Sequence, residues 1–256
     1  MHFYLFGYPI QNSISPKIHN FIFKQFNLDH KYFLFETKKL NDIVNYTNFK
    51  GASITIPFKE QILPYTNILD PASLKIGAVN TIQKKENQLI YGYNTDWIGI
   101  IKPLILINNK KWKDTSVLIL GAGGTARAAI YGLKSVNCSQ IYIFNRTIEK
   151  AGLLASKFKC NFIENLNQIN EVDIIISTIP AAVNYTLPNE IIKLKPIIFD
   201  VNYYPKTTAL TQQAINFNCK YVKGIDMLIY QAIEQNKIWT KNEMDFDKIK
   251  NYLENS

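Results

Sequence analysis

The chain has 256 residues, 47% hydrophobic and 19% charged, which is ordinary for a globular protein able to bury a substantial core. Its formal charge of +9 comes from lysines spread along the chain without a dense basic block, so nucleic-acid binding is not expected. Three widely separated cysteines and three scattered histidines fit neither a disulfide framework nor a structural zinc site.

No segment has the pattern of an export signal or a membrane span. Residues 1–7 lack the basic start and the apolar length of a signal peptide. The longest nearly apolar run, residues 172–183, is too short to span a bilayer and is interrupted by Asp173, Ser177 and Thr178. We therefore expect a soluble, cytoplasmic protein that does not contact the membrane.

Up to about residue 93, short runs rich in aromatic and β-branched residues alternate with helical patterns, which is typical of an α/β unit. Ser15-Pro16 predicts the start of a helix, with Ser15 as N-cap and Pro16 at the first helical position. The apolar residues Ile18, Ile22 and Phe26 keep helical spacing. Strands are predicted at residues 2–6, 31–35, 52–56 and 78–82, and residues 88–91 are expected to complete a hairpin.

The pattern changes after a predicted helix at residues 95–107 and a polar stretch. Residues 116–120 are continuously apolar, as in a strand buried on both faces of a parallel sheet. Strands that alternate with helices at this spacing predict a doubly wound α/β sheet. Further strands are predicted at residues 140–144, 172–176, 197–200 and 220–222, and helices at residues 226–238 and 246–253.

A glycine-rich segment follows the first of these strands. Gly121-Ala122-Gly123-Gly124-Thr125-Ala126 has the pattern GxGxxA and leads into a predicted helix. The first glycine permits a tight turn, the second lets the backbone approach a pyrophosphate, and a small third residue lets helix and strand pack closely. The helix N-terminus favours an anion. An ordinary glycine turn is the alternative, but the strand–turn–helix context favours dinucleotide binding.

The end of the next predicted strand indicates which dinucleotide is bound. NAD sites present an acidic residue there, about 20 residues on, for the ribose 2′-hydroxyl. This chain has Asn145-Arg146-Thr147 instead, with Lys150 one turn later. Because an arginine can bind a 2′-phosphate through two hydrogen bonds, we expect NADP; a surface arginine at a helix start is the alternative. Arg127 either lines the same pocket or lies on the helix surface.

The first part of the chain carries polar residues suited to a substrate site. Ser13 and Ser15 precede a predicted helix, whose N-terminus would help their hydroxyls bind a carboxylate, and no local structural role is evident for Ser13. Lys59 follows a strand and a proline turn, and a plain surface lysine is its alternative. Asn80 lies at a predicted strand. Asp96 lies at a helix start, where it could serve only as a first-turn or N-cap carboxylate.

Seven short motifs occur in one order between residues 7 and 231. They are G-x-P-x-x-x-S-x-S-P-x-x-H-N, G-x-x-x-T-x-P-x-K, G-A-V-N-T, N-T-D, G-A-G-G, N-R-T and G-x-D-M-L-x-x-Q. Together they resemble the shikimate dehydrogenase family over nearly the whole chain. The resemblance implies an α/β substrate domain (residues 1–100, completed by 226–256) and a Rossmann domain (residues 101–225), with the C-terminal helices packing back on the first domain.

The resemblance also implies roles for individual residues. Lys59 and Asp96 would be the catalytic pair, in which the Lys59 ammonium stabilises and protonates the oxygen of a ketone that receives a hydride. Ser13 and Ser15 would bind the substrate carboxylate. Further substrate contacts would come from Thr55, Lys59, Asn80, Asp96, Tyr203 and Gln231. Contacts to NADP would come from Gly121, Ala122, Gly123, Gly124, Thr125, Ala126, Asn145, Arg146, Thr147, Lys150, Ser177, Thr178, Gly224 and Met227, and no metal is expected.

Three residues depart from the family pattern. Ser53 stands where the family usually has Asn, which puts a local polar contact in doubt. Trp97 replaces the glycine common after N-T-D, so packing beside Asp96 is expected to differ. Asp226 occupies a position that is often Gly near the expected nicotinamide pocket, where a carboxylate would weaken cofactor binding.

The implied function is the reversible NADPH-dependent reduction of 3-dehydroshikimate to shikimate in aromatic amino-acid biosynthesis, by an oxidoreductase acting on a CH–OH group. Two alternatives stay open: a quinate/shikimate dehydrogenase with broader substrate use, and a non-catalytic NADP-binding regulator on the same fold. The N-R-T motif and the serine pair argue against the first, and the retained Lys59, Asp96 and Gln231 argue against the second. The expected partner is the small-molecule substrate, bound by a monomer or a homodimer.

Overall fold

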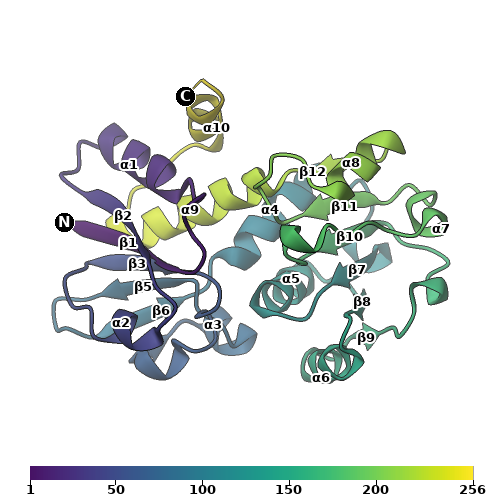
Figure 1. Ribbon diagram of the computed structural model, residues 1–256, viewed down its shortest axis with the longest axis horizontal. Helices are drawn as coiled ribbons and strands as arrows, with labels where there is room; N and C mark the ends of the chain where they lie inside the picture. Colours follow the sequence, from purple (N-terminus) through teal and green to yellow (C-terminus); the bar gives the residue numbers. More distant parts are fainter. Residues whose placement is uncertain (256) are drawn as a thin grey trace. The chain divides into compact units, whose positions relative to one another are not determined.

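The computed structural model describes residues 1–255, and its contacts divide the chain into two compact units. The first unit comprises Met1–Ile98 together with the segment that begins at Leu228, and the second is Gly99–Met227. Each unit has its own sheet (Figure 1). None of the helices found between residues 1 and 255 combines the length and the apolar character that a membrane span requires.

The first unit is built on a mixed six-stranded sheet with the order β2-β1-β3-β5-β6-β4. Strand β1 pairs in parallel with β2 and β3, whereas β5 is antiparallel to both β3 and β6. Strands β5 and β6 form the hairpin that the sequence predicted. The strands are β1 (His2–Gly7), β2 (Lys31–Glu36), β3 (Gly51–Ile54), β4 (Ile68–Leu69), β5 (Thr81–Lys84) and β6 (Ile90–Tyr93).

Helices from both ends of the chain complete this unit. They are α1 (Ser15–Gln25), α2 (Leu40–Val44), α3 (Pro71–Ile76), the start of α4 (Asp96–Ile107), most of α9 (Gly224–Thr240), and α10 (Phe246–Glu254). The C-terminal helices pack on α1, as expected: Phe21 stacks on Tyr252 with ring centroids 4.1 Å apart, and His19 contacts Gln235 of α9. Trp239 of α9 lies in an aromatic core with Phe3.

The start of α1 differs from the prediction. Ser15 is the first helical residue rather than the N-cap, which is Ile14 and makes no capping hydrogen bond through its apolar side chain. The hydroxyl of Ser13 accepts a hydrogen bond from the Ser15 N–H at 3.3 Å, so Ser13 has the local structural role that the sequence did not reveal. The prediction of Ser15 as N-cap is wrong because the preceding serine already serves the first free N–H of the helix.

The predicted strand at residues 78–82 is also misplaced, because β5 begins only at Thr81. The preceding Gly77 ends α3 in the left-handed region, with φ 72°. The backbone of Ala78 and Val79 then bonds outside the sheet: the Val79 N–H donates to the Lys59 carbonyl, and the Asn94 side-chain amide donates to the Ala78 carbonyl. Only from Asn80 does the backbone bond to the neighbouring strands β3 and β6. Ala78 and Val79 thus line the core without belonging to a strand.

The second unit is a doubly wound, all-parallel sheet with the order β12-β11-β10-β7-β8-β9, which confirms the predicted fold class. Its strands are β7 (Ser116–Leu120), β8 (Gln140–Phe144), β9 (Asn161–Phe162), β10 (Ile174–Ser177), β11 (Ile197–Asp200) and β12 (Tyr221–Val222). Its helices are α5 (Gly124–Ser135), α6 (Ile148–Phe158), α7 (Asn189–Ile192) and α8 (Ala209–Asn216).

The strand order places a reversal between β7 and β10. From β7 the chain moves outward to β8 and β9, and then returns to β10 on the other side of β7. In open α/β sheets, ligands bind beyond the carboxyl ends of the strands at such a switch point. The segments that follow β7 and β10, which begin at Gly121 and Thr178, therefore occupy the binding edge of this sheet.

Two glycines offer a matched test of packing. A Cβ on Gly51 would lie 2.5 Å from Nε1 of Trp239, which donates a hydrogen bond to the Ile82 carbonyl, whereas a Cβ on Gly152 in α6 would meet only Phe162, at 3.8 Å. We expect Gly51→Ala to lower the free energy of unfolding by about 2 kcal/mol through overpacking. Gly152→Ala should raise it by about 0.5–1 kcal/mol because alanine favours the helix. Calorimetric unfolding checks both, and equal transition temperatures for the two variants contradict this packing.

Candidate active site and cofactor site

The first unit holds an ion pair between Lys59 and Asp96. Lys59 Nζ lies 2.6 Å from Asp96 Oδ2, and their side chains are 16% and 5% exposed. Lys59 follows the turn after β3, where the Phe58 N–H donates to the Thr55 carbonyl, and Asp96 is the first residue of α4. Lys59 is therefore not a solvated surface lysine. A short, charge-assisted hydrogen bond of this kind aligns an ammonium that can donate a proton.

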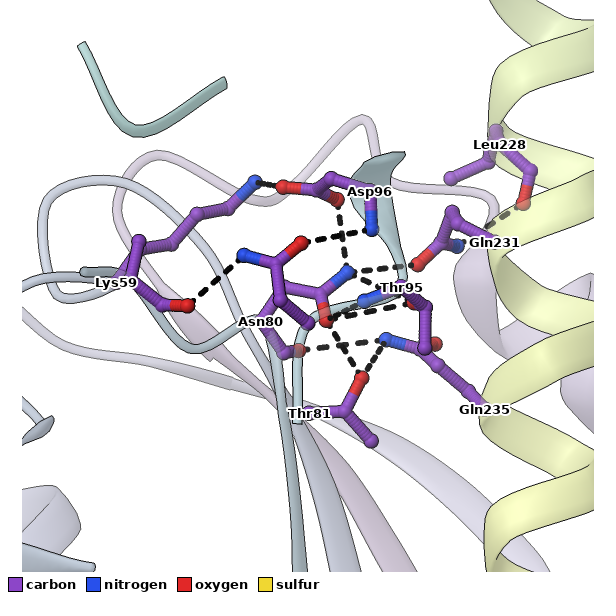
Figure 2. A network of polar contacts seen from close by, with 10 residues as sticks. Lys59, Asn80, Thr81, Thr95, Asp96, Leu228, Gln231 and Gln235 are labelled. Carbon is purple, nitrogen blue, oxygen red and sulfur yellow. Dashed lines mark hydrogen bonds and ion pairs between the residues drawn. The ribbon is translucent and has the colours of Figure 1, made fainter. Parts of the chain in front are cut away.

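Asn80 holds the other oxygen of the same carboxylate (Figure 2). Its Nδ2 donates to Asp96 Oδ1 at 2.7 Å and to Thr95 Oγ1 at 2.9 Å. Its Oδ1 accepts hydrogen bonds from the Thr95 N–H at 2.8 Å and the Thr81 hydroxyl at 2.7 Å. Asn80 and Asp96 are 2% and 4% exposed, so this network is nearly dry. Each carboxylate oxygen thus has its own donor.

Gln231 joins the network from α9, as Figure 2 shows. Its Oε1 lies 3.4 Å from Asn80 Nδ2, and its Nε2 donates to the Leu228 carbonyl at 2.9 Å. The contact with Asn80 is long for a hydrogen bond. The Gln231 amide is therefore held in place by its own helix and keeps hydrogen-bonding capacity toward a ligand.

The predicted carboxylate-binding serines lie near the start of α1. Ser13 Oγ donates to Ser15 Oγ at 3.1 Å, and Ser15 is 6% exposed. Within the described residues, no hydrogen bond joins this pair to the Lys59–Asp96 network. Thr55 belongs to the turn that carries Lys59, and a Cβ on Gly7 would lie 2.2 Å from its methyl group. Gly7 thus lets the segment leading to Ser13 pass directly against that turn.

In the second unit, the glycine-rich turn has the geometry that its pattern predicts. Gly121 has a backbone φ of +111°, which residues with a side chain rarely adopt. A Cβ at this position would lie 2.3 Å from Thr178 Oγ1. The Thr178 hydroxyl and N–H both donate to the Leu120 carbonyl, at 2.9 and 2.8 Å. Gly123 is the N-cap of α5, with open space where its Cβ would be, and Ala126 is fully buried. This cradle fits a pyrophosphate.

The residues predicted to select the cofactor surround the start of α6. Arg146, Thr147 and Lys150 are exposed, and the Asn145 amide donates to the Thr147 carbonyl at 2.9 Å. Exposed basic side chains directly after β8 are available to a phosphate. Ser177, at the end of β10, is 2% exposed, so its side chain faces the core more than the solvent.

The turn after β11 carries Tyr203 and is held by groups that the sequence analysis did not single out. Asp200, 4% exposed, accepts hydrogen bonds from the Asn202 side chain at 2.7 Å and from the Thr208 hydroxyl at 2.6 Å. A Cβ on Gly224 would lie 2.2 Å from the Asn202 carbonyl oxygen, so glycine is required where α9 begins. A carboxylate that ends an apolar strand, followed by Asn two residues later, was the available signal.

Known proteins are similar to this chain in sequence and in fold. A family described as the shikimate dehydrogenase substrate binding domain matches residues 5–82, and one described as shikimate / quinate 5-dehydrogenase matches residues 104–201. The shikimate dehydrogenase (NADP(+)) of Aquifex aeolicus is 35% identical over 250 residues, which cover 94% of this chain and 91% of that protein. This chain belongs to the shikimate dehydrogenase family.

Solved structures of shikimate dehydrogenases have the same fold as this chain. The shikimate dehydrogenase structure from Aquifex aeolicus matches with a TM-score of 0.90 and 32% identity, over 99% of this chain and 97% of that one. The Thermus thermophilus enzyme, solved in complex with NADP(H) and shikimate, matches with a TM-score of 0.84 and 25% identity, over 100% and 99% of the two chains. The chain also matches 17% of the length of the pentafunctional AROM polypeptide of Pneumocystis carinii, at 38% identity over 97% of this chain.

Against the family pattern, Ser53 has a well-defined polar environment. Its hydroxyl accepts a hydrogen bond from the Tyr32 hydroxyl at 2.6 Å and donates to Gln235 Oε1 at 3.0 Å. The same Gln235 oxygen lies 3.1 Å from Nε2 of His19, whose complete burial lowers its pKa to about 3. The serine is thus tied to α9 through residues that short sequence motifs did not connect.

The cradle gives a prediction that separates stability from ligand binding. Gly121→Ala should weaken binding of NADP about tenfold or more and also lower the unfolding temperature, because of its φ and its contact with Thr178. Gly123→Ala, at φ −89° with open space around its Cβ, should fold like the parent chain and lose affinity alone. Isothermal titration with NADP and thermal unfolding measure the two effects. Unchanged affinity in Gly123→Ala would exclude this turn as the pyrophosphate site.

Proposed function

We propose that this chain catalyses the reversible NADPH-dependent reduction of 3-dehydroshikimate to shikimate in the biosynthesis of aromatic amino acids. As a member of the shikimate dehydrogenase family, it is an NADP-dependent oxidoreductase. The observation that carries the proposed mechanism is the 2.6 Å ion pair between Lys59 and Asp96, with Asn80 on the second carboxylate oxygen. A regulator that only binds NADP has no use for such a pair.

In this mechanism the protein stabilises the oxygen on which charge develops. NADPH, when bound, supplies the hydride that adds to the ketone carbon of the substrate. Lys59 as an ammonium would stabilise the negative charge that develops on the substrate oxygen and would deliver the proton. Asp96 holds the ammonium in place and accepts a hydrogen bond from a neighbouring substrate hydroxyl. Lysine suits this role better than arginine because lysine can give up its proton.

Other residues of the first unit would bind the rest of the substrate. The hydroxyls of Ser13 and Ser15, at the N-terminus of α1, suit a carboxylate. Thr55, Asn80 and Gln231 offer a hydroxyl and two amides to the ring hydroxyls, and we assign Tyr203 to the same substrate. The proposed substrate domain is residues 1–100 with 226–256.

The proposed NADP-binding domain is residues 101–225. The pyrophosphate would lie on the Gly121–Ala126 turn, whose glycines leave room for it. Arg146 would bind the 2′-phosphate with help from Thr147 and Lys150, all of them exposed. Further contacts are assigned to Asn145, Ser177, Thr178, Gly224 and Met227.

We further propose a cytoplasmic enzyme that acts as a monomer or homodimer on a small-molecule substrate, without nucleic acid or membrane. Support comes from the free thiols of Cys138, Cys160 and Cys219, because disulfides are common in exported proteins and rare in the cytoplasm. The lysines lie dispersed in the sequence, which does not favour a nucleic-acid surface.

Replacement of Lys59 tests the mechanism. In an assay that follows the absorbance of the reduced nicotinamide, Lys59→Ala should lower kcat with shikimate and NADP roughly a thousandfold, while the affinity for NADP stays unchanged. Lys59→Arg, which keeps the charge but holds its proton, should remain nearly as slow. Lys75→Ala, at an exposed lysine of α3, serves as the control. A loss of less than tenfold in Lys59→Ala contradicts the proton-transfer role.

Replacement of Arg146 tests the cofactor assignment. The parent chain should prefer NADP to NAD and shikimate to quinate in the same assay, and equal turnover of quinate would favour the broader enzyme. Arg146→Asp should reduce kcat/KM with NADP about a hundredfold and leave that with NAD within a few-fold, because the new carboxylate repels the 2′-phosphate. If the ratio of the two cofactors does not change, the 2′-phosphate is bound elsewhere.

A further inference from the structure

We infer that Thr81 and Gln235 are positioning residues for the proposed reaction, because a buried hydrogen-bond relay from Gln235 through Thr81 fixes the amide of Asn80 and, through it, the carboxylate of Asp96. The inference rests on the proposed function of Lys59 and Asp96. Neither relay residue has a carboxylate, an ammonium or a free hydroxyl to offer a substrate: Thr81 is 0% exposed and Gln235 is 1% exposed. They act through Asn80.

The orientation of the Gln235 amide is determined by its neighbours (Figure 2). One end of the amide lies 3.3 Å from the backbone carbonyl oxygen of Asn80, which can only accept. This end must therefore be Nε2, which also donates to Thr81 Oγ1 at 2.9 Å. The opposite end, Oε1, accepts from Ser53 Oγ at 3.0 Å and from Nε2 of His19 at 3.1 Å.

The ring of His19 supports this assignment. Since Gln235 Oε1 is an acceptor, the histidine must carry its proton on Nε2 to make the contact. Complete burial lowers the pKa of His19 to about 3, so the ring is neutral and a single Nε2 proton suffices. The Tyr32 hydroxyl donates to Ser53, and the Ser53 hydroxyl is therefore left to donate to Gln235 Oε1.

Thr81 connects the Gln235 amide to the side chain of Asn80. The Thr81 oxygen accepts a hydrogen bond from Gln235 Nε2. The hydroxyl proton of Thr81 can therefore be donated to Asn80 Oδ1, 2.7 Å away. Oδ1 also accepts from the Thr95 N–H. Two donors on this side oblige the NH₂ group of Asn80 to face Asp96 Oδ1 at 2.7 Å. A reversed amide would place its oxygen against a carboxylate in a nearly dry site, where the repulsion is strong.

The orientation of Asn80 in turn decides how Asp96 meets Lys59. With Oδ1 bound by Asn80, the carboxylate presents Oδ2 to the lysine at 2.6 Å. A carboxylate released from Asn80 can rotate and let the ammonium move. Displacements of about 1 Å in catalytic groups cost on the order of a hundredfold in rate, so even a partial loss of this restraint is measurable.

The test removes one hydroxyl without changing the shape of the side chain. Thr81→Val should lower kcat about tenfold and leave the KM for NADP within twofold, whereas Thr81→Ser, which keeps the hydroxyl, should recover most of the loss. Thr115→Val is the matched control: Thr115 is also 0% exposed, and its hydroxyl donates to the Lys111 carbonyl at 3.0 Å, in the second unit. We expect it to be destabilised to a similar degree and to keep its kcat.

The variant Gln235→Met gives a second test, which asks whether Gln235 acts on Asn80 through Thr81. Because Gln235 acts through Thr81, the double variant with Thr81→Val should be no slower than Thr81→Val alone. Independent, multiplied losses in kcat would mean that the two residues do not form one relay. The three variants are compared at a temperature where each is folded, as judged by circular dichroism.

Crystal structures give a readout that does not depend on activity. In Thr81→Val we expect the Asn80 amide to turn and the distance between Lys59 Nζ and Asp96 Oδ2 to exceed the present 2.6 Å. An unmoved ion pair, parental kcat in Thr81→Val, or failure of Thr81→Ser to recover activity would each overturn the relay. A parent chain that does not turn over shikimate removes the proposed function instead, and the structural arm still decides the geometry.

Discussion

The first unit depends on keeping one carboxylate charged where water hardly reaches it. The Asp96 side chain is 5% exposed, and an isolated charge at that depth costs several kcal/mol. The chain meets this cost with Lys59 on one oxygen and Asn80 on the other. This arrangement requires each neighbouring polar group to present a donor to an acceptor, and these groups come from β3, β5, α4 and α9.

The second unit meets a different constraint, the close approach of two backbone segments at the glycine-rich turn. Gly121 lies at a φ of +111°, and the space of its missing side chain is taken by Thr178 from the neighbouring strand end. The two segments that flank the switch point thus hold each other. Such a turn keeps its N–H groups in position before any anion arrives, so less ordering is needed on binding.

Sequence patterns predicted the elements that are defined by local apolar runs. The strands at residues 116–120, 140–144 and 197–200 are confirmed at both ends, because each apolar run begins and ends at the sheet boundary. Ala78 and Val79 misled the strand prediction because their backbone bonds to a lysine carbonyl and an asparagine side chain. The roles of individual site residues stay predictions.

The contacts that sequence reasoning missed share a physical reason. Ser53 and Gln235 are 182 positions apart, and no periodicity links one serine to one glutamine over that distance. Local motifs identify residues that bind ligands, because those repeat in recognisable spacing. The residues that support them are chosen by tertiary neighbours, and only coordinates reveal which donor faces which acceptor.

The discontinuous make-up of the first unit has a consequence for how the chain reaches its native state. The stretch Gly99–Met227 lies between two segments that must come together, and the buried partners Gln235 and Trp239 belong to the later one. During synthesis the nucleotide-binding sheet can form from contiguous chain, whereas the unit bearing Lys59 must wait for α9. Closing so long a loop makes maturation of that unit the slow, nonlocal part of folding.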